Sequence, residues 1–178
     1  SILLLLGNNA FMGSGEIEFT EAEEKKAFEI SRVKKDLDLC EEVGLKTIVF
    51  DNRIWRLSTC EQPLIKEGDT AKPLWFVSQR LFYNAENVVF NKASNTITLE
   101  GGKQQSVDFI QYQFDSMEAL QEYVGVLMSS YKEHPAFYGV SLFDEPAMEK
   151  LKAVGQLTQA IKGVDPECYV HTCLLPYY

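Results

Sequence analysis

The chain has 178 residues, of which 46% are hydrophobic and 24% are charged, a composition that suits one soluble domain with a buried core. Its net charge is −9 and it has no basic cluster, which argues against a nucleic-acid partner, because phosphate binding needs a concentrated positive surface. The apolar runs are far shorter than the ~20 residues of a membrane-spanning helix, so we expect no membrane partner.

The N-terminal part of the sequence predicts a strand, a helix and a second strand. The apolar run at residues 2–6 is typical of a buried strand, and because the sequence opens inside it we expect residues upstream. Residues 20–43 carry apolar side chains at helical spacing, and Gly44 ends this predicted helix. Residues 45–51 form a second, β-branched strand. This order indicates a repeating β/α unit.

A long insertion, residues 54–114, interrupts the alternation after the second strand. Its polar stretches contain prolines and glycines, while the β-branched runs at residues 88–90 and 96–99 predict a β-hairpin. Long loops inside compact domains are usually functional. We therefore expect the insertion to lie near the functional face of the domain.

Regular alternation resumes after the insertion. Ser116 is a good cap for a predicted helix at residues 117–132. A strand at 137–143, a helix at 147–162 and a strand at 168–174 follow it. The complete order is therefore β-α-β, the insertion, then α-β-α-β.

We predict an α/β fold in which residues 1–178 form one partial domain, a (β/α) barrel with four of its strands. A complete barrel needs eight strands and ~250 residues, so this would be about half of one. A half-barrel exposes strand edges and an apolar interior, so we expect further sequence or another chain to complete it. The alternative is an open doubly wound sheet, which also binds ligands at the carboxyl ends of its strands.

Alternation along the predicted strand at 137–143 points to a catalytic carboxylate. Ser141 and Glu145 share one face of the strand, whereas Val140 shares the other face with apolar residues that would pack on helices. A face of small residues that ends in a carboxylate suits a site that opens at the carboxyl end of the strand. Glu145 would then lie over the site, with Asp144 to its flank.

Hydrolysis of a glycosidic bond needs one carboxyl group that protonates the leaving oxygen and a second carboxylate. We assign Glu145 as the general acid/base, with Asp144 and Asp51 as candidates for the second carboxylate. A competing interpretation is that Asp-Glu-Pro at 144–146 simply begins a helix, because acids and proline favour a first turn. A further alternative is a metal-assisted enzyme that uses the same three carboxylates.

The stretch EHPAFYGVSLFDEP at 133–146, followed by TCLLPYY at 172–178, resembles an uncharacterised bacterial family of barrel glycoside-hydrolase-like proteins. That family has a DEP motif after one strand and an LLP-x-Y motif after a later strand. The resemblance implies a glycosidase of carbohydrate metabolism that cleaves O-glycosyl bonds. Many proteins of this kind act outside the cytoplasm, secreted or periplasmic, but the sequence itself does not give the compartment. Two positions depart from the patterns of such enzymes: Cys173 replaces an Asn before Leu-Leu-Pro, and Asp144 replaces the Asn that precedes the acid/base Glu in the retaining clan.

Other polar and aromatic residues near the predicted strand ends are candidates for substrate contacts. These are Asn8, Asn9, Arg53, Trp55, His171 and Tyr177. The ring of Trp55 or Tyr177 could stack on the apolar face of a sugar. The four cysteines lack metal-ligand spacing, so we predict no metal and no cofactor. The alternative function is a non-catalytic glycan-binding or structural module.

Overall fold

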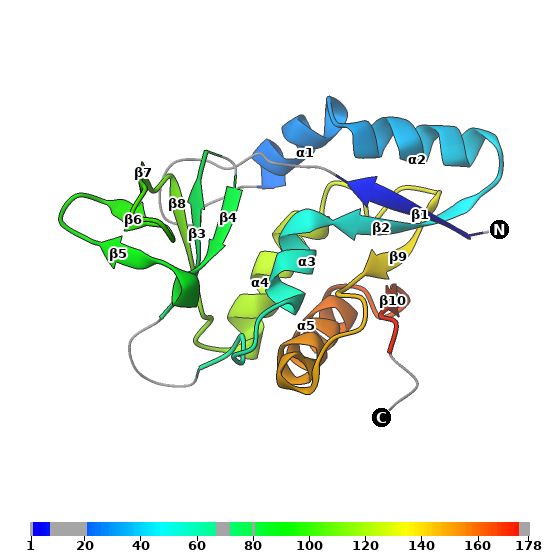
Figure 1. The fold of residues 1–178 in the computed structure, drawn as a ribbon. Coiled ribbons are helices and arrows are strands. Elements are labelled where there is room, and N and C mark those ends of the chain that lie inside the picture. Colours follow the sequence, from blue (N-terminus) through cyan, green and yellow to red (C-terminus); the bar gives the residue numbers. More distant parts are fainter. Residues whose placement is uncertain (1, 8–20, 67–71, 80, 175–178) are drawn as a thin grey trace.

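The computed structural model describes residues 2–7, 21–66, 72–79 and 81–174 (Figure 1). A parallel sheet and its helices form one part of the molecule, and two antiparallel sheets lie together on one side of it (Figure 1). None of the helices in these ranges is both long and apolar enough to span a membrane.

The central feature is a parallel sheet of four strands. They are β1 (Ile2–Gly7), β2 (Lys46–Asp51), β9 (Phe137–Ser141) and β10 (Tyr169–His171). Their order in the sheet is β1-β2-β9-β10, and every neighbouring pair is parallel. All four carboxyl ends therefore lie along one edge of the sheet, which is where ligands bind in open parallel sheets.

The predicted (β/α) barrel is wrong. The described strands form an open four-stranded sheet and two small antiparallel sheets, and they show no barrel arrangement. The β-α-β order was the basis of that prediction, but open and closed parallel sheets share it, because closure depends on strand number and stagger. The expectation that a missing half completes the barrel loses its basis with it.

Two helices occupy the place of the first predicted helix. They are α1 (Glu21–Glu29) and α2 (Arg32–Glu42). The chain breaks at Ser31, whose side chain accepts a hydrogen bond from the backbone N–H of Lys34 and so caps α2. Gly44 follows α2 with a φ of 70°, a conformation that glycine adopts readily. Helix α2 contacts both β1 and β2.

The other helices are α3 (Asn52–Ser58), α4 (Met117–Met128) and α5 (Leu151–Val164), which follows the short 3-10 helix η2 (Met148–Lys150). Helices α4 and α5 pack against each other, and α3 contacts both. Ser116 caps α4, as the sequence predicts.

One hydrophobic cluster joins the sheet to these helices. Val140 and Leu142, two residues on along the same face of the chain, belong to it, so the prediction that the apolar face of this strand packs on helices is confirmed. Helices α2, α4 and α5 contribute fully buried leucines, namely Leu37, Leu120, Leu127 and Leu157. Burial of this apolar surface is the main favourable term in folding and fixes the helices on the sheet.

The insertion forms two three-stranded antiparallel sheets. The first sheet consists of β3 (Pro73–Ser78), β4 (Leu81–Asn84) and β8 (Phe109–Tyr112). The second consists of β5 (Val89–Asn91), β6 (Thr96–Thr98) and β7 (Gln104–Ser106), and the 3-10 helix η1 (Ala85–Asn87) lies between β4 and β5. Strands β5 and β6 pair antiparallel, which confirms the predicted hairpin. Phe76 and Ile97 belong to a small separate core, whereas Trp75 belongs to the main one.

The close contact between β9 and β10 predicts the cost of one substitution. A Cβ added at Gly139 would lie 1.9 Å from the carbonyl oxygen of Tyr169. Gly139→Ala therefore forces the strands apart, and we expect the free energy of unfolding to fall by about 1–3 kcal/mol in urea denaturation. In the matched control, Gly155→Ala on α5, the added Cβ meets nothing within 4 Å. That variant should gain about 0.5–1 kcal/mol; equal stability of the two variants would contradict the packing.

Candidate functional site

The carboxyl edge of the parallel sheet holds most of the residues that the sequence nominates. Strand β2 ends at Asp51, and Arg53 and Trp55 follow it on α3. Strand β9 leads into Asp144 and Glu145, while β10 ends at His171. Asn8, Asn9 and Tyr177 lie outside the residues that the structure describes.

Asp51 is buried and fully engaged by hydrogen bonds. Its Oδ1 accepts from the backbone N–H and the Nε of Arg53, each at 3.0 Å. Its Oδ2 accepts from the Nη2 of Arg53 at 2.8 Å and from the hydroxyl of Tyr131 at 3.2 Å. The first of these bonds caps α3. Asp51 and Arg53 therefore form a structural ion pair, which neither the catalytic nor the substrate-binding prediction anticipated.

The ionisation of this pair follows from its surroundings. Burial by itself would raise the pKa of Asp51, but the charge and hydrogen bonds of Arg53, together with the Tyr131 hydroxyl, outweigh it and lower that pKa. Burial and the Asp51 charge hold the pKa of Tyr131 well above its ordinary value. Asp51 therefore stays ionised and Tyr131 stays protonated, so the hydroxyl keeps its donor role.

Glu145 has a strained backbone. Its φ is 53°, in the left-handed region that non-glycine residues seldom adopt. Its backbone N–H donates to the carbonyl oxygen of Cys173 at 2.8 Å, and its side chain is exposed. Non-glycine residues in the left-handed region that do not form a turn or a helix end are found most often at functional sites. There the surrounding structure holds the strained backbone in place.

Hydrogen bonds from two sides hold the loop that carries Glu145. The backbone N–H of Leu142 donates to the carbonyl of His171 at 2.8 Å, and the hydroxyl of Thr172 donates to the carbonyl of Phe143. On the other side, the N–H of Phe143 donates to the hydroxyl of Ser58 at 2.9 Å. The loop is therefore fixed to both β10 and the end of α3.

The loop does not begin a helix. Residue 144 lies in a bend, the 3-10 helix η2 begins at Met148, and α5 begins at Leu151. Neither η2 nor α5 has a side-chain cap hydrogen bond. The competing interpretation of 144–146 as a helix start is therefore wrong, and the two carboxylates are free of that role.

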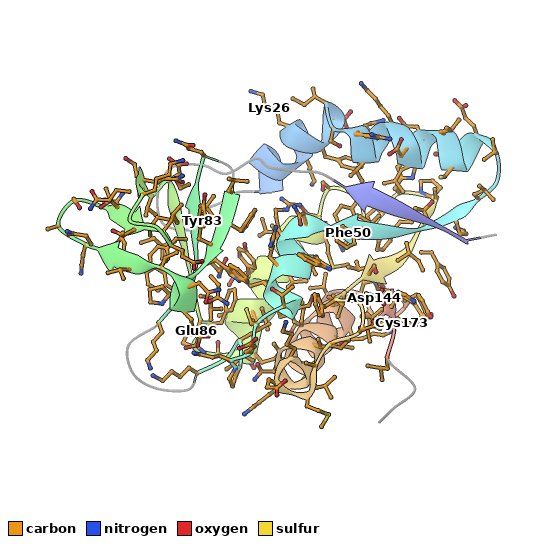
Figure 2. All side chains as sticks on the ribbon, viewed as in Figure 1. Lys26, Phe50, Tyr83, Glu86, Asp144 and Cys173 are labelled. Carbon is orange, nitrogen blue, oxygen red and sulfur yellow. The ribbon has the colours of Figure 1, made fainter. Side chains whose placement is uncertain are left out.

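Asp144 and Cys173 lie close together after β9 and β10 (Figure 2), and Glu145, which follows Asp144 in the chain, completes what we call the acidic cluster. All three residues are exposed. Partial desolvation and the neighbouring carboxylates of Asp144 and Glu145 raise the pKa of the Cys173 thiol. Cys173 therefore remains a neutral thiol and is unsuited to act as a nucleophile.

Two groups of aromatic rings lie on the elements that lead to this cluster. The ring of Trp55 lies 5.5 Å from that of Phe50 and 5.6 Å from that of Phe143, which directly precedes Asp144. On β10, the ring of Tyr169 stacks on Tyr138 at 5.3 Å, and both are exposed. The sequence analysis singled out Trp55 but missed the Tyr138–Tyr169 stack, which depends on the pairing of β9 with β10.

His171 lies near the carboxyl end of the same face. Its Nδ1 is 3.5 Å from the hydroxyl of Ser141, at the limit of a hydrogen bond, and its ring is 6.3 Å from that of Tyr169. Ser141 and His171 are partners in the register of β9 and β10. The structure thus brings His171 to the same sheet edge as Glu145, as the sequence predicts.

A shallow concave region lies within the insertion, between the residues that follow α3 and the strands β3 and β4. It is open to solvent and is lined by Cys60, Glu61, Gln62, Pro73, Leu74, Asn84 and Glu86. Burial raises the pKa of the Cys60 thiol to about 12, so this cysteine is inert. The region contains no base beside a nucleophile, and we assign it no chemistry.

The described residues contain no group of three or more His, Cys, Asp or Glu side chains that could hold a metal ion. This removes the support for the metal-assisted alternative, since Asp51 is enclosed in its ion pair. Comparison of the chain with protein families, curated proteins and solved structures finds no match.

The Asp51–Arg53 pair predicts a pH-dependent loss of stability. Because folding lowers the pKa of Asp51, its contribution is present above the unfolded value of about 3.9 and is lost as pH falls through the folded value. Asp51→Asn leaves Arg53 buried beside a neutral group, so we expect the free energy of unfolding at pH 7 to fall by about 3–5 kcal/mol. The variant should also lose less additional stability than the parent on acidification to pH 3.

The control for this prediction is Asp36→Asn. Asp36 pairs with Arg32 at 3.4 Å on the surface of α2, where the Arg32 side chain is 81% exposed. Exposed pairs contribute little, so urea denaturation should show almost no change. Equal effects of the two substitutions would contradict the structural role of Asp51.

Proposed function

We propose that the protein is a carbohydrate-active hydrolase in which Glu145 is the general acid/base. The observation that carries the proposal is the left-handed backbone of Glu145, which a hydrogen bond to the segment after β10 holds at the carboxyl edge of the sheet. A glycine there would relieve the backbone, and the helix-start explanation of this carboxylate is excluded. An exposed carboxylate on a backbone that hydrogen bonds hold in place, with no helix to cap, suits proton transfer to a bound substrate.

The surroundings of Glu145 support carbohydrate as the substrate class. Phe143, whose ring contacts that of Trp55, is two residues before Glu145, and the exposed Tyr138–Tyr169 stack lies on β9 and β10, where the Tyr169 ring is 6.3 Å from that of His171. Aromatic rings offer flat apolar platforms for sugar rings. The resemblance of residues 133–146 to glycoside-hydrolase-like proteins agrees with this chemistry.

The proposed reaction needs two carboxyl groups. Glu145 in its acid form donates a proton to the glycosidic oxygen as the bond from that oxygen to the anomeric carbon breaks. A second carboxylate then either takes a proton from the attacking water or attacks the anomeric carbon itself. Within the described residues Asp144 suits this second role better than Asp51, whose carboxylate is enclosed by Arg53 and Tyr131.

The second candidate is a glycan-binding module without catalytic activity. The enclosure of Asp51 favours it, because one of the two nominated partners of Glu145 is withdrawn into the core. In this case the same sheet edge would bind sugars, but no bond would be cleaved. Hydrolysis assays distinguish the two functions directly.

Glu145→Gln removes the transferable proton and keeps the size of the side chain. We expect kcat on oligosaccharides with a poor leaving group to fall by about 10²–10⁴, because general acid catalysis contributes that much. Glu149→Gln, in the exposed first turn of η2, is the matched control and should retain full activity. Binding without hydrolysis in both parent and variant would replace the enzyme by the glycan-binding module.

Glu145→Gly tests whether the strain at this position is kept for function. Glycine adopts the left-handed region without steric cost, so we expect the free energy of unfolding to rise by roughly 0.5–1 kcal/mol while activity is lost. Gln79, with a φ of 50°, is the matched position, and Gln79→Gly should be stabilised similarly with activity unchanged. A destabilised Glu145→Gly variant would instead assign this side chain a structural role.

A further inference from the structure

A row of alternating aromatic and cationic side chains adjoins the acidic cluster. The guanidinium carbon of Arg56 lies 5.0 Å from the ring centre of Trp55 and 5.3 Å from that of Phe82. The Nζ of Lys150 lies 4.7 Å from the ring centre of Phe143, which contacts Trp55. We call Phe82, Arg56, Trp55, Phe143 and Lys150 the cation–aromatic row.

The two cations of the row lack carboxylate partners. Among the described residues, neither Arg56 nor Lys150 forms an ion pair within 4.0 Å. The Nε of Arg56 is also buried without a hydrogen-bond acceptor in the described part of the chain. A partly buried cation normally has a paired anion, because desolvation is costly. In a chain with a net charge of −9, two cations without carboxylate partners at the two ends of one pair of contacting rings, Trp55 and Phe143, call for an explanation.

The row is continuous with the candidate catalytic loop. Phe143 directly precedes Asp144 and Glu145 along the chain. Its backbone N–H is held by Ser58 at the end of α3, the helix that also carries Arg56. A ligand that reaches Glu145 can therefore extend over the row.

The chemistry of the row suits a negatively charged sugar. A guanidinium presents a planar fork of N–H donors that fits a carboxylate or a sulfate with two hydrogen bonds, and rings that flank it restrict its orientation. Lys150 adds a second positive charge beside Phe143, and aromatic rings accept the apolar faces of sugars. The two cations also offset the repulsion that Asp144 and Glu145 would exert on an anionic substrate.

We propose that the substrate is an anionic glycan whose uronic acid carboxylates or sulfate esters bind Arg56 and Lys150 at separate positions along the row. This inference rests on the proposed function, since it names the substrate class of the same site. It also assigns the row a role in specificity beyond fixing α3 to the loop.

Calorimetric titration of the Glu145→Gln protein, which would bind without turnover, tests the inference. The probes are trisaccharides of galacturonic, glucuronic and mannuronic acid, the methyl ester of each, and a sulfated galactose trisaccharide with its unsulfated form. We expect at least one anionic probe to bind about tenfold or more tightly than its neutral counterpart, and more weakly as salt increases. Preference for uronate over sulfate, or the reverse, identifies the anion.

Three further substitutions in the same background connect that preference to the row. Arg56→Lys keeps the charge but loses the fork, and Lys150→Gln loses the charge. Each should reduce affinity for the anionic probe by about tenfold and leave affinity for the neutral counterpart unchanged. The matched control is Lys152→Gln, on the exposed surface of α5, which should alter neither. Thermal unfolding of each variant shows whether it is folded.

Failure of the inference can be separated from failure of the proposed function. Equal binding of charged and neutral probes, or equal losses for both in the row variants, would overturn the anionic substrate and leave carbohydrate binding intact. Selective binding of an anionic probe that the parent protein never hydrolyses would support the row and overturn the hydrolase. Absence of binding to every probe would overturn both.

Discussion

The buried ion pair of Asp51 with Arg53 is the interaction on which the arrangement of the site depends. It caps α3 at the end of β2, and the hydroxyl of Tyr131 ties it to the segment after α4. Helix α3 in turn supplies Ser58, which holds the backbone of Phe143, and Trp55, which packs on its ring. A carboxylate that resembles a catalytic group from its position in the sequence thus acts by orienting the elements around Glu145.

The opposite assignment of two carboxylates at one sheet edge follows from their surroundings. Asp51 is enclosed and receives four hydrogen bonds, whereas Glu145 is exposed on a strained backbone and has no helix to cap. The two groups end neighbouring strands, so a sequence reading that considers only strand ends treats them alike. Burial and hydrogen bonding separate a structural carboxylate from one that is available to a ligand.

Local features of the fold could be predicted from the sequence because they depend on short-range chemistry. Alternation placed Val140 and Leu142 against the helices, Ser116 was a recognisable cap, and β-branched runs predicted the hairpin of β5 and β6. Closure of the sheet could not be predicted in this way, since β-α-β alternation is common to open sheets and barrels. The barrel prediction failed for that reason.

Only the part of the candidate site that depends on strand ends could be predicted from the sequence. Strand ends brought His171 and Glu145 to one edge, as parallel pairing requires. The pairing of Tyr138 with Tyr169, and the contact of Arg56 with Phe82 from the insertion, join segments that are distant in the sequence. No periodicity or motif in one sequence encodes such long-range contacts.

The crystal structure of the Glu145→Gln protein with a bound oligosaccharide is the most direct test of the central claim, that the carboxyl edge of the sheet binds carbohydrate with Glu145 at the bond to be cleaved. It should show a glycosidic oxygen within hydrogen-bond distance of the residue 145 amide and a sugar ring over the neighbouring aromatic side chains. A sugar bound elsewhere on the molecule, with residue 145 facing solvent, would contradict the claim.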